Sequence, residues 1–286
     1  MIVRAFAKVN LALEVGPRRA DGYHPLLTIF QLLALADVLT IEPCDTLDFA
    51  VAGDAPQGPE NLVVRAANSL ARHAGVEPRA RIHLEKSIPT GGGLGGGSSD
   101  AAAALAGLDR LWGTRAPLED LYRIAAALGS DVPYFLLGGT ALGLGRGEKL
   151  FPLPDLPRFH VVLALPGIAV STAAAYKAFD ELPREEHAVS SDRWRYTALW
   201  SWEAGAFAGL ANDLEEPVFR EHAILGQLKG VLARSGAEHA LMSGSGSTVY
   251  GLFRAEETAR RAAEAVRAEG VRAVVTETIG RVAFGV

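Results

Sequence analysis

The sequence predicts an α+β protein built from two domains. Residues 2–15 alternate apolar and polar side chains, as a strand does, and residues 89–99 form a glycine-rich loop between a predicted strand and a predicted helix. In the C-terminal part, predicted helices and strands follow one another in mixed order, which suits a two-layer α+β sandwich. The proline-rich segment 151–157 is typical of a domain boundary. We therefore expect one domain over residues 1–152 and a second over residues 153–286.

The composition narrows the class of protein. Of the 286 residues, 49% are hydrophobic, which is ample for packed cores. The net charge of −5 and the lack of a basic block argue against a nucleic-acid partner. Cys44 is the only cysteine, which favours a reducing compartment, and Lys8 and Glu14 interrupt the apolar run that a signal peptide needs. We expect a cytoplasmic protein, a monomer or weak homodimer, with no membrane partner.

The N-terminal strand carries the first candidate site residues. Lys8 and Asn10 are two positions apart, so they share one face of the strand. A turn at residues 18–25 and a second strand to about residue 35 follow. Two simpler interpretations stay open: Lys8 as an ordinary surface lysine, and Tyr23 with His24 as the cap of a hairpin.

The next predicted elements lead to the glycine-rich loop. Strands are expected at 38–42 and 47–51. Asn61 is expected to cap a helix that reaches residue 74 and stops at Gly75. Polar and apolar side chains alternate over residues 81–88, which favours a half-exposed antiparallel strand.

The loop at residues 89–99 holds six glycines in eleven residues. Such a run is retained where the backbone needs positive φ angles or where another molecule comes very close. Ser98 and Ser99 are predicted to cap a helix that ends at Gly113, and the free amide groups of a helix N-terminus bind anions. The predicted phosphate-binding residues are Pro89, Thr90, Gly91, Gly92, Gly93, Leu94, Gly95, Gly96, Gly97, Ser98 and Ser99.

Other kinds of loop fit this pattern less well. The glycines satisfy the dinucleotide-binding spacing, but any run this dense would do so by chance, and the half-exposed strand before it does not suit a doubly wound sheet. The P-loop of nucleoside triphosphatases needs a lysine, and none precedes Ser98. A flexible linker is not normally set between a strand and an apolar helix.

Asp131 is the next candidate. It follows a predicted helix at 117–128 that closes at Gly129. As a structural feature it is a helix N-cap with Pro133 in the first turn; as chemistry it is a carboxylate placed to reach into a cleft. Both interpretations stay open at this point. The glycine-rich residues 138–147 are expected to form a strand and a turn.

The C-terminal part begins with a predicted strand at 160–165. Helices are expected at 171–182, 221–234 and 255–269, and strands at 237–242, 248–253 and 271–278. The aromatic residues at 192–202, which are Trp194, Tyr196, Trp200 and Trp202, are expected to pack onto a core. Residues 243–247, Ser-Gly-Ser-Gly-Ser, are either a polar hairpin loop or a second backbone nest for a phosphate group.

Lys8, the glycine-rich loop and the 243–247 loop, in this order, resemble the superfamily of galactokinase, homoserine kinase, mevalonate kinase and phosphomevalonate kinase (GHMP). Within it, four segments resemble the 4-diphosphocytidyl-2-C-methyl-D-erythritol kinase family: residues 7–11, 21–24, 60–63 and 130–133. The resemblance implies an N-terminal domain like domain 2 of ribosomal protein S5, a ferredoxin-like C-terminal domain and a cleft between them. It also implies ATP-dependent phosphorylation of the 2-hydroxyl of that compound, in the non-mevalonate route to isoprenoids.

The resemblance also implies residue roles. Asp131 would accept the proton of the attacking hydroxyl, Lys8 would hold Asp131 ionised, and Asn61 would lie near the adenine of ATP. The substrate would contact Asn10, Tyr23, His24, Thr172, Tyr176, Ser243, Gly244, Ser245 and Gly246, with the cytosine between Tyr23 and Tyr176. Mg²⁺ is expected to arrive with ATP, without an identified protein ligand.

Two alternatives to this function remain. One is another small-molecule kinase of the superfamily, which the absence of cytosine stacking by Tyr23 and Tyr176 would favour. The other is a nucleotide-binding regulator without catalysis, against which an intact Lys8 and Asp131 would count.

Overall fold

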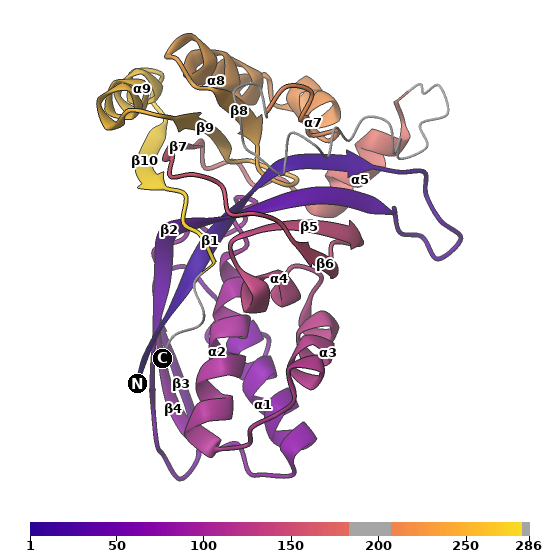
Figure 1. Ribbon diagram of the computed structural model, residues 1–286, viewed down its shortest axis with the longest axis vertical. Helices are drawn as coiled ribbons and strands as arrows, with labels where there is room; N and C mark the ends of the chain where they lie inside the picture. Colours follow the sequence, from indigo (N-terminus) through magenta and orange to yellow (C-terminus); the bar gives the residue numbers. More distant parts are fainter. Residues whose placement is uncertain (183–206, 282–286) are drawn as a thin grey trace.

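The structure, a computed structural model, describes residues 1–182 and 207–281. It contains two sheets, which form the lower and upper parts of the molecule in Figure 1. The lower sheet follows the order β3-β4-β2-β5-β6, and β1 pairs with β2 off this path. The upper sheet follows the order β10-β7-β9-β8. The α+β prediction is confirmed.

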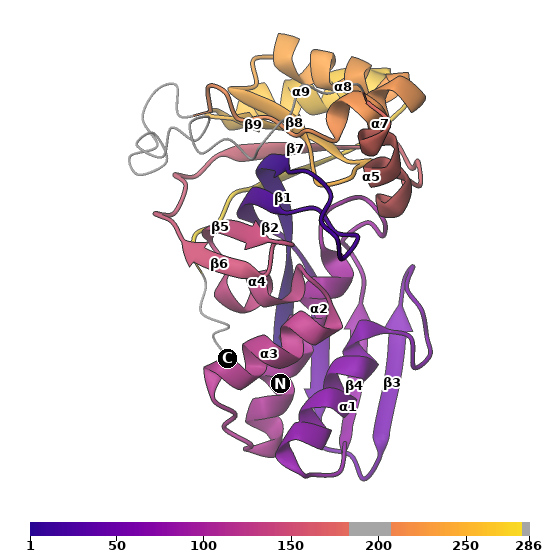
Figure 2. The same cartoon turned by 90° about the vertical axis from the view of Figure 1, so that its right-hand side faces the viewer.

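The N-terminal elements occur as follows. The strands are β1 (Ile2–Val15), β2 (Leu26–Glu42), β3 (Leu47–Ala52), β4 (Ala80–Glu85), β5 (Thr140–Gly145) and β6 (Lys149–Pro152). The helices are α1 (Leu62–Ala74), α2 (Gly96–Trp112), α3 (Leu118–Leu128) and α4 (Val132–Leu137). Figure 2 shows the helices packed together on one side of the long strands.

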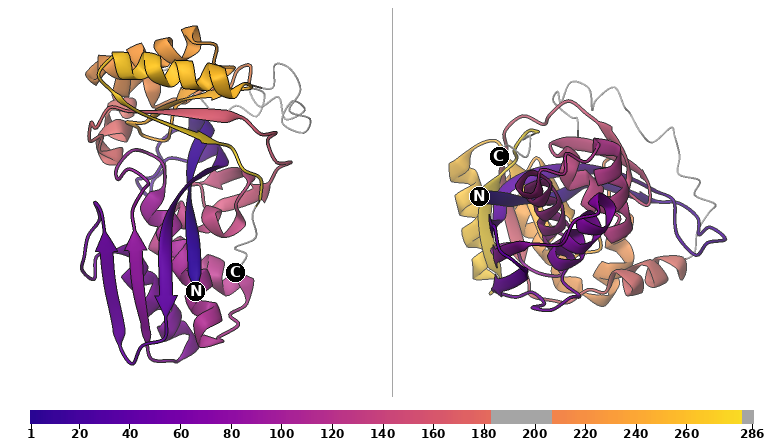
Figure 3. Two further views of the ribbon diagram at one scale, coloured as in Figure 1. Left: turned by 90° about the vertical axis from the view of Figure 1, so that its left-hand side faces the viewer. Right: turned by 90° about the horizontal axis from the view of Figure 1, so that it is seen from below.

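The C-terminal elements form the upper sheet and the helices that pack on it. The strands are β7 (His160–Leu165), β8 (His239–Met242), β9 (Val249–Phe253) and β10 (Arg272–Glu277), and the helices are α5 (Thr172–Asp180), α7 (Glu215–Glu221), α8 (Ala223–Arg234) and α9 (Glu256–Ala268). In Figure 3 (left), α8 and α9 cover the outer face of this sheet, and the long strands of the lower part reach up to its other face. The proposed division at residue 152 coincides with the end of β6, and the exact domain limits stay a prediction.

Strand β2 differs from the prediction. Instead of one strand ending near residue 35 and another at 38–42, a single strand runs over 17 residues. The reason is tertiary: β2 pairs with β1 along most of its length, with β5 over residues 26–31 and with β4 over residues 38–42. Strand β4 has the predicted alternation of burial and is antiparallel to β2, but it is also parallel to β3.

Helix boundaries largely follow the predicted caps. The Asn61 side chain accepts a hydrogen bond from the Val63 amide at the start of α1, and Gly75 ends that helix with a left-handed φ of 68°. The helix predicted at 221–234 is confirmed as α8, which begins at Ala223. The sequence did not predict the short helix α7 before it, and the two are separated at His222 (φ −126°, ψ 73°), where the chain leaves helical geometry. The aromatic cluster at 192–202 lies outside the described residues.

A shared core joins the two sheets. Val9 and Leu11 of β1 belong to the same buried cluster as Val161 of β7 and Tyr250 of β9. The Tyr250 hydroxyl donates to the Asn10 carbonyl (2.9 Å), so β1 is fixed from above by β9. Among the described helices, none is long and apolar enough to span a lipid bilayer.

Candidate active site

A cleft of about 960 Å³ holds most of the predicted site residues. Its walls come from β1, the β1–β2 hairpin loop, the glycine-rich loop, the segment before α4, α5 and the loop between β8 and β9. The residues among them that the sequence predicted are Lys8, Asn10, Tyr23, His24, Gly91, Gly93, Gly95, Asp131, Thr172, Tyr176, Gly244, Ser245 and Gly246. Segments more than 200 residues apart therefore meet in one cavity.

Lys8 lies at the base of this cleft and is buried, so its interpretation as a surface lysine is wrong. Its Nζ donates to Asn10 Oδ1 (2.7 Å) and lies 3.6 Å from Asp131 Oδ2. Burial lowers the pKa of Lys8, against the opposing effect of the Asp131 charge and hydrogen bond. A nearby negative charge would stabilise the charged form of a lysine buried in this way.

Asp131 occupies the N-cap position of α4, but its side chain makes no capping hydrogen bond. The carboxyl instead lies beside Lys8, and the side chain is 36% exposed. Both interpretations that the sequence left open therefore apply. Asp131 stands at the N-cap position of α4, and its carboxylate, which makes no capping bond, lines the cleft and can meet a ligand there.

Asn10 is oriented by its neighbours on β1 and β2. Its Nδ2 donates to Thr28 Oγ1 (2.7 Å), and the Thr28 hydroxyl donates to the Ala12 carbonyl (2.7 Å). Because Nδ2 is fixed on Thr28, Oδ1 is directed at Lys8. This buried chain of hydrogen bonds fixes the positions of both side chains.

The glycine-rich loop separates the cleft from a second cavity of about 330 Å³. The second cavity is lined by residues 89–98 together with Asn61, Lys86 and Asp100, among others, so Asn61 and the loop share one cavity. The place of Asn61 near the adenine of ATP stays a prediction. The Asn61 amide Nδ2 is bonded to the Pro56 carbonyl (2.8 Å). Gly91, Gly93 and Gly95 line both cavities, so one loop can contact ligands on its two sides.

The prediction that Ser98 and Ser99 cap the following helix is wrong. Helix α2 begins at Gly96, and its N-cap is Gly95 with a left-handed φ of 72°. A glycine takes this φ without strain, so the helix starts earlier than a serine cap would allow. In the part of the chain that the structure describes, the buried Ser99 hydroxyl has no hydrogen-bond partner.

Tight packing on the protein side explains two of the loop glycines. A β-carbon on Gly93 would lie 2.0 Å from the Ser243 carbonyl oxygen, and one on Gly95 would lie 2.6 Å from the Phe135 ring. These glycines are therefore required by the protein's own packing. A hydrogen bond also crosses this contact, since Ser243 Oγ donates to the Gly93 carbonyl (2.8 Å).

The 243–247 loop, which belongs to the C-terminal part of the chain, approaches Asn10 and Lys8. The position of a β-carbon on Gly244 would lie 3.4 Å from Asn10 Oδ1 and 3.6 Å from Lys8 Nζ. Asn212 holds this loop from behind, donating from Nδ2 to the carbonyls of Met242 (2.8 Å) and Gly244 (2.7 Å). The sequence analysis missed Asn212, whose role depends on a contact across 32 residues.

Aromatic rings gather at the far end of the cleft. The His24 and Tyr176 rings are stacked, with centroids 5.5 Å apart and planes at 24°, whereas Tyr23 is largely exposed. His24 Nδ1 lies 2.8 Å from the Gly16 carbonyl, and Nε2 lies 3.4 Å from Asp180 Oδ1. Burial, and then the Asp131 charge, raise the pKa of Tyr176. Thr172 Oγ1 lies 3.0 Å from Ser245 Oγ, which links α5 to the 243–247 loop.

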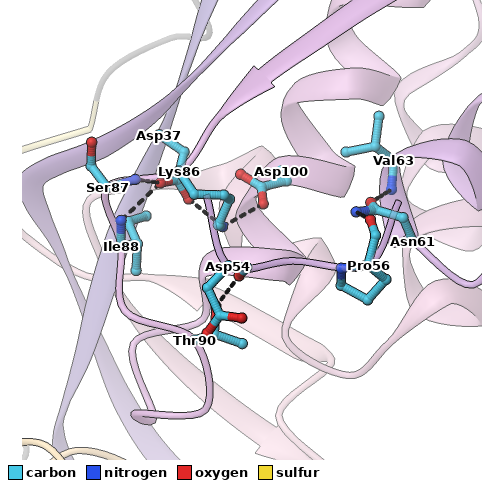
Figure 4. A network of polar contacts seen from close by, with 10 residues as sticks. All are labelled: Asp37, Asp54, Pro56, Asn61, Val63, Lys86, Ser87, Ile88, Thr90 and Asp100. Atoms are coloured by element: carbon cyan, nitrogen blue, oxygen red, sulfur yellow. Dashed lines mark hydrogen bonds and ion pairs between the residues drawn. The ribbon is translucent and has the colours of Figure 1, made fainter. Parts of the chain in front are cut away.

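A buried cluster that the sequence did not predict lies behind the glycine-rich loop (Figure 4). Lys86 Nζ donates to Asp37 Oδ2 (2.5 Å) and to Asp100 Oδ2 (2.7 Å). No local pattern marks these three residues as partners, since Asp37 and Lys86 are 49 positions apart.

The fold and these sites define a GHMP kinase. The models described as "GHMP kinases N terminal domain" and "GHMP kinases C terminal" match residues 61–139 and 201–272. Proteins named 4-diphosphocytidyl-2-C-methyl-D-erythritol kinase are 45% identical in Solibacter usitatus (strain Ellin6076), over 92% of this chain and 84% of that protein, and 45% identical in Moorella thermoacetica (strain ATCC 39073 / JCM 9320), over 96% and 98%. A crystal structure of 4-(cytidine 5'-diphospho)-2C-methyl-D-erythritol kinase matches with a TM-score of 0.82 and 42% identity, over 98% of this chain and 100% of that one. The chain belongs to the 4-diphosphocytidyl-2-C-methyl-D-erythritol kinase family. The predicted family and the two-domain GHMP fold are confirmed.

Proposed function

We propose that this kinase transfers the γ-phosphoryl group of ATP to the 2-hydroxyl of 4-diphosphocytidyl-2-C-methyl-D-erythritol, a step of the non-mevalonate route to isoprenoids. The observation that carries the proposal is the Lys8–Asp131 pair, 3.6 Å apart, in a cleft with the glycine-rich loop in its wall. The names of the relatives support the choice of substrate, and the stacked His24 and Tyr176 rings would serve as a receptor for its pyrimidine.

In the proposed mechanism, Asp131 accepts the proton of the substrate's 2-hydroxyl as its oxygen attacks the γ-phosphorus. The bond between the γ-phosphorus and its bridging oxygen then breaks, and ADP leaves with that oxygen. Lys8 holds the Asp131 carboxylate in position before the reaction and stabilises the negative charge of the attacking oxygen during it. A positioned general base contributes about 10²- to 10⁴-fold in rate, or roughly 3 to 5 kcal/mol of barrier.

The two ends of the substrate are assigned to different walls of the cleft. Asn10 would hold the methylerythritol end beside Lys8, while Tyr23, His24 and Tyr176 would hold the cytosine. Thr172, Gly244, Ser245 and Gly246 line the cleft and would close over the diphosphate between them, because backbone amides in such loops bind anions. Ser243 is buried outside the cleft lining and would act from behind, through its hydrogen bond to the Gly93 carbonyl. The observed His24–Tyr176 stack suggests that His24 contributes as much to this receptor as the more exposed Tyr23.

ATP would place its phosphates on residues 89–99, with Asn61 near the adenine. Magnesium would arrive on the phosphate oxygens of ATP and supply charge neutralisation there. Within residues 1–182 and 207–281, no three His, Cys, Asp or Glu side chains gather as a candidate metal site. The proposal names no protein ligand for the ion.

The test is ADP release by the purified protein with Mg²⁺ and ATP, comparing 4-diphosphocytidyl-2-C-methyl-D-erythritol with mevalonate and homoserine. Selective turnover of the cytidine compound supports the proposal. Turnover of another alcohol would make the protein a different kinase of the superfamily. Tight ATP binding without turnover of any of the three would favour a regulator instead.

A further inference from the structure

The cluster of Asp37, Lys86 and Asp100 is tied to both ends of the glycine-rich loop. Lys86 lies three residues before the loop, and Asp100 follows it directly in the first turns of α2. Asp37 of β2 accepts hydrogen bonds from the amides of Ser87 (2.5 Å) and Ile88 (2.8 Å). The Lys86 ammonium also lies 3.2 Å from the position of a β-carbon on Gly96. A change in the cluster would therefore move the loop.

The cluster holds one cation and two carboxyl groups, all of them buried (Figure 4). Asp37 accepts from three N–H donors, including Lys86. Among the described residues, Asp100 accepts from Lys86 alone, and its other oxygen, Oδ1, is buried without a partner. An ionised Asp100 would leave a net negative charge in the protein interior with half of its carboxylate unsolvated, which is costly.

The ATP site is adjacent. Lys86 and Asp100 both line the 330 Å³ cavity with residues 89–97 of the loop. The triphosphate of ATP would therefore bring several negative charges close to the cluster, and like charges disfavour ionisation of a carboxyl group. Of the two carboxyls, Asp100 has fewer donors and is the one in contact with the cavity.

We propose that Asp100 is a positioning residue that takes up a proton when ATP binds, so that the Asp37–Lys86–Asp100 cluster becomes neutral beneath the phosphates. This inference rests on the proposed function, because it requires ATP phosphates on the glycine-rich loop. In chemical terms, the Asp100 carboxylate and one proton from the solvent become a neutral carboxyl group. The Lys86–Asp37 ion pair remains and continues to hold the loop.

The electrostatic surroundings agree with this geometry. Burial, and then the charge of Asp37, raise the pKa of Asp100 to about 7, against the opposing charge of Lys86. Burial opposes the charge on Lys86, but Asp100 and Asp37 more than offset it, so the pKa of Lys86 is raised. Of the other charged groups nearby, Glu60 lies before α1 on the same cavity, and Lys8 and Asp131 line the cleft on the other side of the loop. Proton uptake by Asp100 is thus accessible near neutral pH.

The experiment is isothermal titration calorimetry of Mg·ATP into the full chain at pH 7.5, in phosphate, HEPES and Tris, whose ionisation enthalpies differ. The buffer dependence of the binding heat gives the number of protons taken up. We expect wild type to take up about half a proton more than Asp100→Asn, since the amide cannot titrate. Comparing the two proteins removes the contribution of the ATP phosphates themselves. Glu60→Gln, which removes an exposed charge from the same cavity, should match wild type.

Two further readouts separate this role from a merely structural one. The KM for ATP of wild type should rise several-fold between pH 6.5 and 8.5, and that of Asp100→Asn should stay flat. If Asp100→Asn does not fold, the proton uptake of wild type alone tests the proposal. This uptake should be largest between pH 7 and 8 and small at pH 6. Equal proton counts in wild type and Asp100→Asn, or wild-type uptake independent of pH, would overturn the inference while ATP binding stands. Absence of any ATP binding would overturn the proposed function and this inference together.

Discussion

Two buried lysines flank the glycine-rich loop, and their surroundings differ in a way that separates chemistry from support. Lys8 has one carboxylate neighbour, Asp131, at 3.6 Å and partly exposed to the cleft. Lys86 has two, Asp37 and Asp100, at 2.5 and 2.7 Å and both buried. The pKa of Lys8 is lowered, mainly by burial, whereas the carboxyl groups around Lys86 outweigh burial and raise its pKa.

The difference concerns what each lysine still lacks. Lys8 has less negative charge around it than its burial demands, so a ligand with developing negative charge would be stabilised there. Lys86 has more negative charge around it than its own positive charge balances, and the excess negative charge is on Asp100. The first site is suited to a reaction and the second to holding a loop in place. Paired substitutions at the two sites can test this distinction.

The largest expected effect comes from removing the carboxylate beside Lys8. Asp131→Asn should lower kcat by about 10²- to 10⁴-fold, because an amide cannot accept the proton. The variant should fold and bind both substrates, since the Asp131 side chain makes no capping bond. Steady-state kinetics and thermal unfolding check both points. Asp100→Asn is the matched control and should change kcat at saturating ATP by far less; equal losses in the two variants would contradict the distinction.

Replacing each lysine by methionine should affect activity at one site and stability at the other. Lys86→Met leaves two buried carboxyl groups without their cation and should lower the free energy of unfolding by about 3–5 kcal/mol. Lys8→Met removes a charge that burial disfavours, so it should abolish turnover with little loss of stability. Urea unfolding at pH 7.5 measures both. A Lys8→Met protein as unstable as Lys86→Met would show that the two lysines support the fold alike.

The sequence predicted the residues of the Lys8 site but not the burial of Lys8. The motif order placed Lys8, the glycine-rich loop and Asp131 in one site, and the structure brings them together. Alternation along residues 2–15 suggested a strand with one exposed face, yet residues 7–13 are all buried. The C-terminal sheet covers this strand through contacts such as Tyr250 with Asn10, which no local pattern contains.

At the Lys86 cluster, in contrast, the sequence did not predict the residues of the site. Lys86 and Asp100 stand beside a recognised motif, but an isolated lysine before a loop and an aspartate in a helix have many ordinary uses. Only the crossing of β2 behind the loop, which brings Asp37 to both, makes them a cluster. Asn212 was missed for the same reason, since its partners lie in the distant 243–247 loop. Helix caps are local, and the Asn61 and Gly75 caps of α1 were predicted correctly, whereas the serine cap of α2 was wrong because Gly95 takes the cap position.

A smaller effect is expected from the loop that separates the two lysines. Gly93→Ala forces a β-carbon to within 2.0 Å of the Ser243 carbonyl oxygen at a φ of +76°, so the loop and the 243–247 segment must move apart. A positive φ alone costs about 1–2 kcal/mol, which corresponds to a roughly tenfold rise in the KM for ATP if the cost falls on the bound loop. Gly97→Ala is the control, because its nearest neighbour is Leu62 at 3.8 Å. Similar KM values in both variants would show that the loop tolerates the displacement.

The smallest effect is a pH dependence of stability in which two buried groups oppose each other. Burial lowers the pKa of His239, which donates from Nε2 to the Leu11 carbonyl, to about 4. Between pH 4 and 6.5 the unfolded chain therefore binds more protons than the fold at His239, and stability rises with pH. Asp100 has a raised pKa in the folded state, so over the same range the fold binds more protons there and stability falls as pH rises. Each slope is at most about 1.4 kcal/mol per pH unit, so wild type should be nearly flat between pH 4.5 and 6.5.

Single substitutions should expose each slope in turn. Asp100→Asn should become more stable with rising pH, because only the His239 contribution remains. His239→Gln, which keeps an N–H donor for Leu11, should become less stable with rising pH, because the Asp100 contribution remains. Urea unfolding at half-unit steps of pH measures both. If Asp100→Asn and wild type respond to pH in the same way, Asp100 does not have a raised pKa in the fold; if His239→Gln and wild type do so, the pKa of His239 is not lowered.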